Sequence, residues 1–175
     1  MERVPYRAME GASAYDGLRL PVSILLDNVR SMYNVGAFFR TADGAGIERL
    51  LLSGITARPP MNAISKTALG AEERVPWEPV ADLNARLKDL RQHGYEIAAI
   101  ETSNRAVDLF DWRPHFPVCV LFGHEVDGIG AEVLAACDTH VRIPMLGLKH
   151  SLNVASAGAI VMYELLRKYR ELHEK

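Results

Sequence analysis

Short, mostly apolar runs alternate with stretches of helical periodicity along this chain. The runs fall at residues 22–26, 49–52, 95–100 and 118–122, with a last short strand predicted at 140–143. Apolar runs of this length, bounded by turn residues, are typical of strands buried in a parallel sheet. The stretches between them predict helices over 34–46, 62–69, 81–93 and 130–137, and a final helix from a cap at Ser151 to about Lys168. Strands that alternate with helices predict an α/β protein with a mostly parallel sheet.

The composition bounds the number of domains. With 175 residues, 49% hydrophobic and 24% charged, the chain has enough apolar residues for one sizeable core and no room for a second full domain. Residues 1–20 are polar and lack a clear period, so we expect an N-terminal arm followed by a single domain over 21–175. No run of about 18 apolar residues and no leader pattern occurs. We therefore expect a soluble, cytoplasmic protein that makes no membrane contact.

The cysteines and histidines lack the spacing of a metal site. Cys119 lies within an apolar run and Cys137 follows two alanines, so both are predicted to be small buried hydrophobes. The six histidines are scattered, without an HxxxH or HxH pattern. We predict no metal. A net charge of −2 and a pI near 6.3 disfavour a surface that binds polyanions everywhere, but a local group of Lys and Arg can still attract a phosphate backbone.

Three segments in the last third place glycines or small polar residues directly after strand-like runs. They are LFGHEVDG (121–128), RIPMLG (142–147) and HSLNVASAGAIVMYEL (150–165). Three such loops expose backbone at the ends of strands, which favours a pocket for a flat ligand. The glycines at 123, 128 and 130 fit neither GxGxxG nor GxxxxGK[ST], so a dinucleotide fingerprint or a P-loop is disfavoured. Glu125, just past a strand, lies where ligands of open α/β sheets bind.

Taken singly, the polar residues of these segments have ordinary explanations. Asn34 and Ser151 would serve as helix caps, and Asn153 fits the start of a helix. Arg40 alone would be a surface or ion-paired arginine. Only their joint order along the chain carries a functional interpretation.

That ordered set resembles one family. NVGAFFRTADGAGI, LFGHEVDGIGAEVL and VRIPMLGLKHSLNVASAGAIVMYELL are similar to the three motifs of the SpoU-type (TrmH-like) RNA ribose 2′-O-methyltransferases, members of the SPOUT superfamily, across about residues 22–168. The resemblance implies an α/β sheet with a deep trefoil knot at its C-terminal end, and bent S-adenosylmethionine in the pocket. It also implies a tRNA or rRNA substrate, and a homodimer formed through the final helix and the helix after the first strand.

The resemblance also implies roles for individual residues. The cofactor would be held largely by backbone groups of Gly123, Ile143, Met145 and Leu152, with Glu101 or Thr102 at the end of the 95–100 strand. The catalytic positions of the motifs correspond to Asn34, Arg40, Glu125, Ser151 and Asn153.

Three other functions stay open at this point. One is a SPOUT enzyme that methylates a base, and a second is a non-catalytic module of the same fold that binds RNA or the cofactor. The third is a Rossmann-like nucleotide enzyme.

Overall fold

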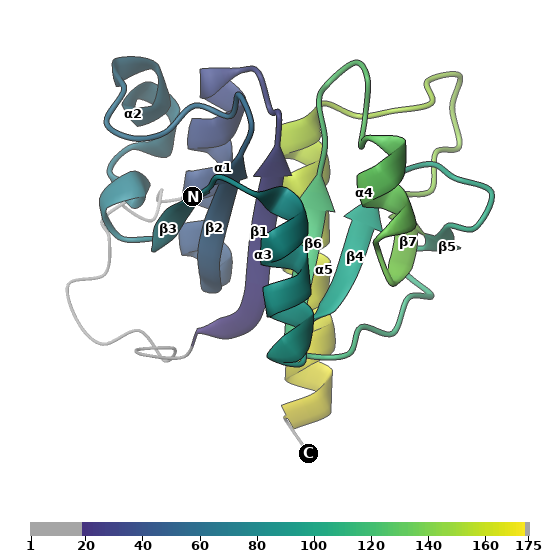
Figure 1. Cartoon of the computed structure of the whole chain (residues 1–175). Helices are drawn as coiled ribbons and strands as arrows, with labels where there is room; N and C mark the ends of the chain where they lie inside the picture. The colour runs from purple at the N-terminus through teal and green to yellow at the C-terminus, as the bar shows by residue number, and fades with distance from the viewer. Residues whose placement is uncertain (1–18, 174–175) are drawn as a thin grey trace, which may run out of the picture.

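Seven parallel strands form one sheet in the order β3-β2-β1-β6-β4-β7-β5 (Figure 1). The computed structural model describes residues 19–173. The strands are β1 (Leu20–Asp27), β2 (Ile47–Ser53), β3 (Trp77–Val80), β4 (Glu96–Ile100), β5 (Val107–Asp108), β6 (Val118–Phe122) and β7 (Thr139–Arg142). The helices are α1 (Met32–Ala45), α2 (Asn62–Ala68), α3 (Leu83–Gln92), α4 (Ala131–Ala135) and α5 (Val154–His173), with a 3₁₀ turn, η1, at Ala71–Glu73. The predicted α/β class with a parallel sheet is confirmed.

The two strands that sequence patterns missed lie at the two edges of the sheet. β3 contains Glu78 and Pro79, and β5 is only two residues long. An edge strand tolerates proline, because one side of its backbone needs no ladder partner. Neither strand therefore carries the apolar run that marked the central strands.

Two predicted helix caps are wrong. Helix α1 begins at Met32, and its cap is Ser31, whose Oγ accepts a hydrogen bond from the Asn34 backbone N–H at 3.3 Å. At α5, Asn153 rather than Ser151 caps the helix, since its Oδ1 accepts from the backbone of Ala155 at 2.9 Å. Both errors have one cause: several neighbouring residues have capping side chains, and backbone geometry decides which one caps.

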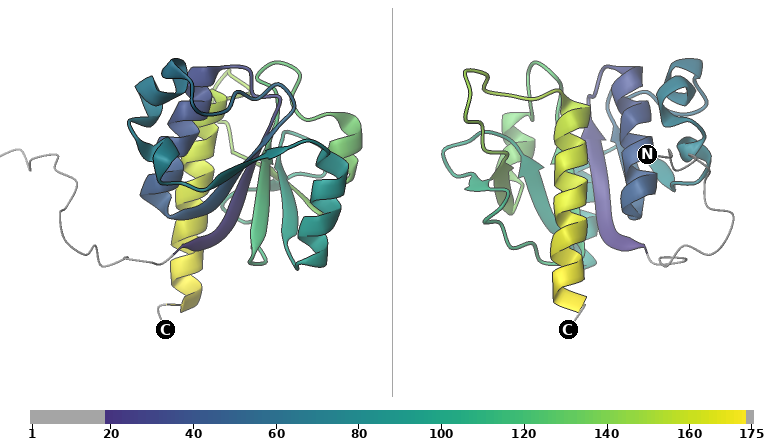
Figure 2. Two further views of the ribbon diagram at one scale, coloured as in Figure 1. Left: turned by 60° about the vertical axis from the view of Figure 1, so that its left-hand side comes forward. Right: turned by 180° about the vertical axis from the view of Figure 1, so that it is seen from behind.

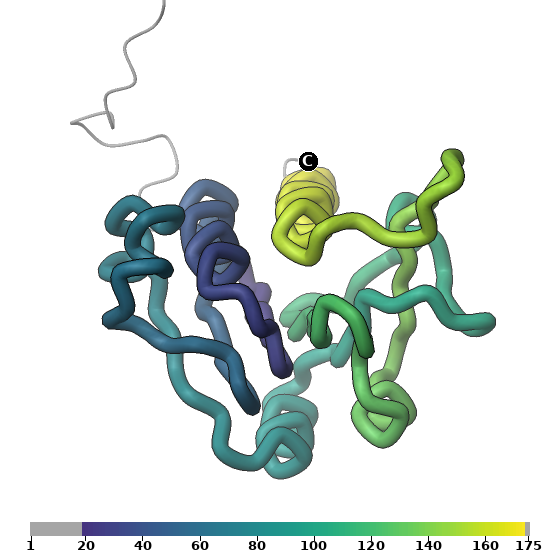
Figure 3. Tube along the Cα trace, turned by 90° about the horizontal axis from the view of Figure 1, so that it is seen from above, coloured from purple at the N-terminus to yellow at the C-terminus, as the bar shows by residue number. Residues whose placement is uncertain are grey.

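The helices cover both faces of the sheet. Helices α1, α2 and α5 lie on one face, while α3 and α4 lie on the other (Figures 1 and 3). Viewed from behind, α5 and α1 run side by side across the sheet (Figure 2). Gly158 makes this approach possible, because a Cβ there would lie 2.3 Å from the Phe38 ring. Cys119 and Cys137 are buried beneath α3 and α4, as predicted.

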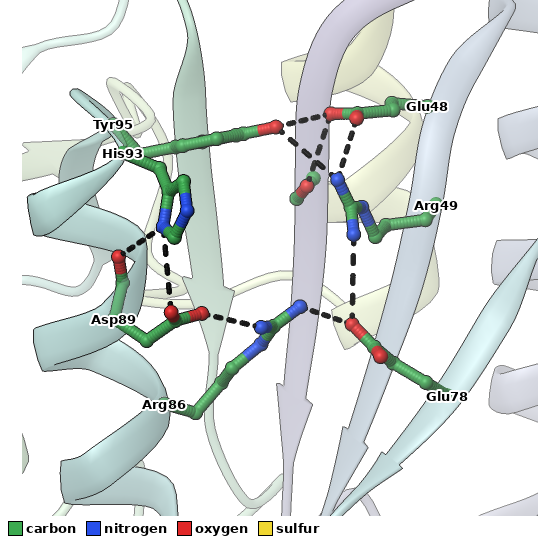
Figure 4. A network of polar contacts seen from close by, with 8 residues as sticks. Glu48, Arg49, Glu78, Arg86, Asp89, His93 and Tyr95 are labelled. Carbon is green, nitrogen blue, oxygen red and sulfur yellow. Dashed lines mark hydrogen bonds and ion pairs between the residues drawn. The ribbon is translucent and has the colours of Figure 1, made fainter.

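A partly exposed polar network joins α3 to the neighbouring strands (Figure 4). Arg49 contacts Glu48 at 2.6 Å and Glu78 at 3.7 Å. Arg86 of α3 pairs with the same Glu78, which lies in β3. The Tyr95 hydroxyl donates to Glu48 at 2.6 Å. Single exposed ion pairs contribute about 0–1 kcal/mol. The network therefore links α3 to the neighbouring strands, but it contributes much less stability than the apolar core does.

The described part of the chain does not test the predicted N-terminal arm, the predicted domain boundary or the predicted knot. The arm expected over residues 1–20 lies outside the described part of the chain up to residue 18, and the first described strand begins at Leu20. The division at residue 20 and the trefoil knot stay predictions. Among the helices of residues 19–173, none is both long enough and apolar enough to span a membrane.

Candidate active site

A cavity of about 400 Å³ opens at the carboxyl ends of the central strands. The chain runs from β1 outward to β2 and β3, and later returns to place β6 against the other side of β1. Crevices at such reversals of strand order are the usual ligand sites of open α/β sheets, and this cavity lies on the β6 side of the reversal, lined by the ends of β4, β6 and β7 and by the start of α5. The lining residues are Ile100, Glu101, Thr102, Phe122, Gly123, His124, Glu125, Val126, Gly128, Arg142, Ile143, Met145, His150, Ser151, Leu152, Asn153, Val154 and Ala157.

Most of the predicted site residues meet at this cavity. All six predicted cofactor positions line it: Glu101, Thr102, Gly123, Ile143, Met145 and Leu152. Three of the five predicted catalytic positions also line it: Glu125, Ser151 and Asn153. The three glycine-containing loops of the last third thus form one pocket, together with the end of β4.

Glu125 connects the two strands at which the strand order reverses. Its Oε2 accepts from the Arg30 backbone N–H and its Oε1 from the Ser31 N–H, both at 3.0 Å. Oε1 also accepts from Asn34 Nδ2 at 3.0 Å. Burial acts to raise the pKa of the Glu125 carboxyl, but these hydrogen bonds outweigh burial and hold the pKa below its ordinary value. The carboxylate is therefore charged at neutral pH and holds the start of α1 at the pocket.

Asn34 and Asn153 extend this connection to α5. Asn34 Oδ1 accepts from Asn153 Nδ2 at 3.2 Å, while Asn153 Oδ1 caps the helix. Each amide uses both its donor and its acceptor, so both side-chain orientations are determined. Glu125, Asn34 and Asn153 form one hydrogen-bonded chain, which we call the polar chain, and it joins the loops after β1, β6 and β7.

Glu101 holds the 123–128 loop from the other side. Its Oε2 accepts from the Ile129 N–H at 3.2 Å, and its Oε1 accepts from the Thr102 N–H at 2.9 Å. The loop folds tightly: Gly128 has φ +69, and a Cβ on Gly123 would lie 2.4 Å from the Gly128 carbonyl oxygen. Oε1 also accepts from the Thr102 hydroxyl at 3.4 Å, so Oε2 is the oxygen of Glu101 that can still accept a hydrogen bond from a ligand.

Several lining residues were not predicted from sequence, although most lie within one or two positions of a predicted one. Arg142 directly precedes Ile143 and pairs with Asp108 at 2.6 Å. His124 follows Gly123, and its Nδ1 accepts from the Val126 N–H at 3.2 Å. The others are Ile100, Phe122, Val126, Gly128, His150, Val154 and Ala157. The only sequence feature that could have indicated these lining residues is their position next to the motif residues.

No group of three or more His, Cys, Asp or Glu side chains between residues 19 and 173 is arranged to hold a metal ion.

The loops that form this cavity carry the motifs of a known family. Residues 21–163 match the SpoU rRNA Methylase family. The chain belongs to this family. A protein of Staphylococcus epidermidis assigned to the TrmH family of tRNA/rRNA methyltransferases is 32% identical over 90% of this chain and 63% of its own length. The chain thus spans less than two thirds of the curated relatives that it matches.

Solved structures of proteins that methylate RNA share the fold. The AdoMet-bound rRNA methyltransferase of Sinorhizobium meliloti has a TM-score of 0.78 and 29% identity, over 83% of this chain and 56% of that one. A structure that describes the 2-OH methylation of C/U34 on tRNA has a TM-score of 0.75 and 27% identity, over 88% of this chain and 97% of that one. The predicted family is therefore confirmed, and the Rossmann-like alternative is excluded.

Two of the predicted catalytic positions, Asn34 and Arg40, do not line the cavity. Asn34 is hydrogen-bonded to the lining residues Glu125 and Asn153, whereas Arg40 lies further along α1. It lies on α1 six residues after Asn34, which is about 9 Å along the helix axis, and its side chain is exposed. It is not among the residues that line the pocket. The described chain therefore brings together four of the five predicted catalytic residues and leaves Arg40 on the adjacent surface.

Proposed function

We propose that this protein is an S-adenosylmethionine-dependent RNA methyltransferase that transfers a methyl group to a ribose 2′-hydroxyl of tRNA or rRNA. The observation that carries the proposal is the convergence of the three SpoU-family motif loops on one cavity of about 400 Å³. That volume lies within the range of small-molecule and cofactor sites. An AdoMet-bound relative with the same fold supports the choice of cofactor.

The pocket suits the charge and shape of this cofactor. Gly123 and Gly128 line the cavity without side chains, so a flat group would meet bare backbone there. Ile143, Met145 and Leu152 add apolar walls. The cofactor carries a sulfonium and an ammonium cation, and the carboxylates of Glu101 and Glu125 lie in the same cavity. Opposite charges in a partly enclosed site attract more strongly than they do in water.

S-adenosylmethionine, when bound, would supply the methyl group: a new bond from the ribose oxygen to the methyl carbon would form as the bond from sulfur to that carbon breaks, and the electron pair of the broken bond would stay on sulfur. The hydroxyl proton must leave during the attack. Arg40 cannot accept it, because a guanidinium has no acceptor and is not deprotonated in proteins.

Arg40 instead binds the adjacent phosphate and stabilises the developing alkoxide, while the proton passes to a phosphate oxygen or to water. Ser151 orients the guanidinium. The polar chain of Glu125, Asn34 and Asn153 keeps the three loops in register around the reacting groups.

The exposed position of Arg40 favours a site completed by a second subunit. A homodimer through α5 and α1 would bring the partner subunit's Arg40 to the cavity. It would also join basic residues of two subunits into one track for RNA, drawn from Arg30, Arg40, Arg58 and Lys66. Cytoplasmic location follows from such an RNA substrate and is part of the proposal.

Active-site complementation tests the shared site. Arg40→Ala and Ser151→Ala should each be inactive, but a mixture of the two should recover about a quarter of wild-type activity, because half of the dimers are mixed and each has one intact site. Sedimentation velocity on the same samples reports the oligomeric state. A monomer, or a mixture that stays inactive although the subunits exchange, would contradict the proposed dimeric site.

The reaction itself is tested with tritiated S-adenosylmethionine and bulk tRNA or rRNA. Methylation of a ribose 2′-hydroxyl makes the adjoining phosphodiester bond resistant to nuclease, so label should appear in an undigested dinucleotide. Label on a base would favour the SPOUT base methyltransferase. If calorimetry shows cofactor binding but no label is transferred, a non-catalytic binding module is favoured.

The role of Arg40 is tested by two substitutions. We expect Arg40→Ala and Arg40→Lys to lower turnover by about 10²- to 10³-fold while calorimetry shows unchanged cofactor binding, because lysine cannot reproduce a planar bidentate contact. Arg113→Lys is the control, since Arg113 is exposed in the loop before β6, at the amino end of that strand, whereas the cavity opens at the carboxyl ends. Near-normal turnover of Arg40→Lys would refute the bidentate role.

A further inference from the structure

The start of α1 presents Tyr33, which the proposed function does not use, and Arg30, which so far has only a general place in the proposed RNA track. Arg30 precedes the helix cap, and its side chain is exposed. Tyr33 is 54% exposed although its neighbour Asn34 belongs to the polar chain. An aromatic ring and a guanidinium three positions apart, beside a proposed RNA site, are the two groups that recognise an unpaired nucleotide.

The backbone that carries these side chains is held in place. Glu125, which lines the cavity, accepts from the Arg30 N–H at 3.0 Å. The Tyr33 carbonyl accepts from Thr67 Oγ1 of α2 at 3.0 Å. Ser31 caps the helix between them. The backbone of Tyr33 therefore has a defined position relative to the cavity and loses little freedom when the ring binds a ligand.

The charge of this corner favours a nucleic acid over an acidic surface or an apolar protein segment. The first turns of α1 and α2 in the described chain contain no acidic residue. Lys66 lies in the last turn of α2, and the exposed Arg58 precedes that helix. The Glu125 carboxylate also lies at this corner, but its oxygens accept hydrogen bonds from the Arg30 and Ser31 N–H groups. Phosphates would meet the positive side chains of Arg30, Arg58 and Lys66, and bases would meet the exposed ring.

We propose that Tyr33 and Arg30 bind an unpaired nucleotide next to the nucleotide that is methylated, with its base stacked on the Tyr33 ring and its phosphate on the Arg30 guanidinium. This inference rests on the proposed function and adds a substrate class: RNA in which the target nucleotide lies in a single-stranded loop or end. A base inside a paired helix has no free face to stack on the ring.

Binding to two short RNA probes tests this site without the cofactor. One probe is a fluorescent oligouridylate octamer, and the other is a ribose-phosphate octamer without bases. We expect fluorescence anisotropy to show that the wild-type protein prefers the probe with bases. Tyr33→Ala should weaken binding of that probe by about 5- to 150-fold, the range of one lost stacking contact, and should leave binding of the base-free probe unchanged.

Companion variants separate stacking from charge. Tyr33→Phe should bind both probes like the wild type, because the ring remains. Arg30→Ala should weaken both probes alike and lower the slope of log affinity against log salt by about one. Phe110→Ala, which removes an aromatic side chain that is 59% exposed in the loop after β5, should change neither affinity.

The outcomes distinguish this inference from the proposed function. Equal binding of the two octamers by the wild type, no binding of either, or an unchanged preference in Tyr33→Ala overturns the nucleotide site. Calorimetry with S-adenosylmethionine checks that Tyr33→Ala is folded and still binds the cofactor. Failure of the wild type to bind that cofactor would instead overturn the proposed function, whatever the octamers show.

Discussion

At the scale of single residues, the central position is Glu125. A carboxylate is well suited to it, because one side chain accepts three N–H groups that would otherwise lack partners at the mouth of the cavity. The sequence predicted that this residue belongs to the site from its place after a strand. It did not reveal the partners, since Ser31 is 94 positions away along the chain.

The stability that Glu125 contributes to the wild type should depend on pH. The folded-state pKa is lowered, so the contribution of the carboxylate is complete above the unfolded pKa, near 4.3, and is lost as pH falls through the folded value. We expect Glu125→Gln to have a lower free energy of unfolding than the wild type at pH 7. Denaturant unfolding should show this difference shrinking below about pH 4. A difference that does not change with pH would contradict the assignment.

At the scale of elements, Asn153 combines two functions that substitutions can separate. Asn153→Ala removes the cap of α5 and should lower stability by about 0.5–2 kcal/mol. Asn153→Asp keeps a capping oxygen but has no Nδ2 donor for Asn34. We expect low methyl transfer from both variants and lower thermal stability only in the alanine variant. Full activity of Asn153→Asp would show that methyl transfer does not need the hydrogen bond from Asn153 to Asn34.

The crossing of α1 and α2 depends on a glycine. A Cβ on Gly36 would lie 2.3 Å from the Ile64 carbonyl oxygen and 2.1 Å from Thr67 Oγ1. Thr67 can rotate, but the carbonyl belongs to the α2 backbone. Alanine in place of glycine favours an isolated helix by about 1 kcal/mol. Overpacking of a core contact costs about 1–3 kcal/mol.

We therefore expect Gly36→Ala to unfold at lower urea concentration than the wild type, as followed by circular dichroism. The control is Gly130→Ala, because a Cβ at Gly130 meets nothing within 4 Å and its φ of −56 suits any residue. Equal midpoints for Gly36→Ala and the wild type would show that α2 moves away without cost.

At the scale of the whole molecule, the accessibility of the two cysteine thiols measures how often helices α3 and α4 move away from the sheet. Burial raises the pKa of Cys119 to about 12 and that of Cys137 to about 11. At pH 8 roughly one Cys137 thiol in a thousand is then ionised, and fewer of Cys119. We expect iodoacetamide to label neither residue in the native protein and both in urea, as measured by mass spectrometry. Rapid labelling of native Cys119 would show that this face opens readily.

The whole fold also shows which elements local sequence patterns can predict. Apolar runs located every central strand, and the motifs located the cavity. The edge strands β3 and β5 escaped because a half-covered or two-residue strand needs no apolar run. The caps at Asn34 and Ser151 were misplaced because neighbouring polar residues compete for the same role, and only backbone geometry selects among them.

By itself the sequence determined the alternation of strands and helices and the burial of the central strands. These follow from interactions between residues close in the chain and from the preference of apolar side chains for the core. Apart from Glu125, the polar residues around the cavity were identified only because their order along the chain resembles the motifs of one family. Only the tertiary structure decided that Glu125 holds the start of α1, that Asn153 meets Asn34, and that Arg40 lies on the surface beside the cavity. Those contacts join loops brought together by the strand order, and no local spacing records which strands become neighbours.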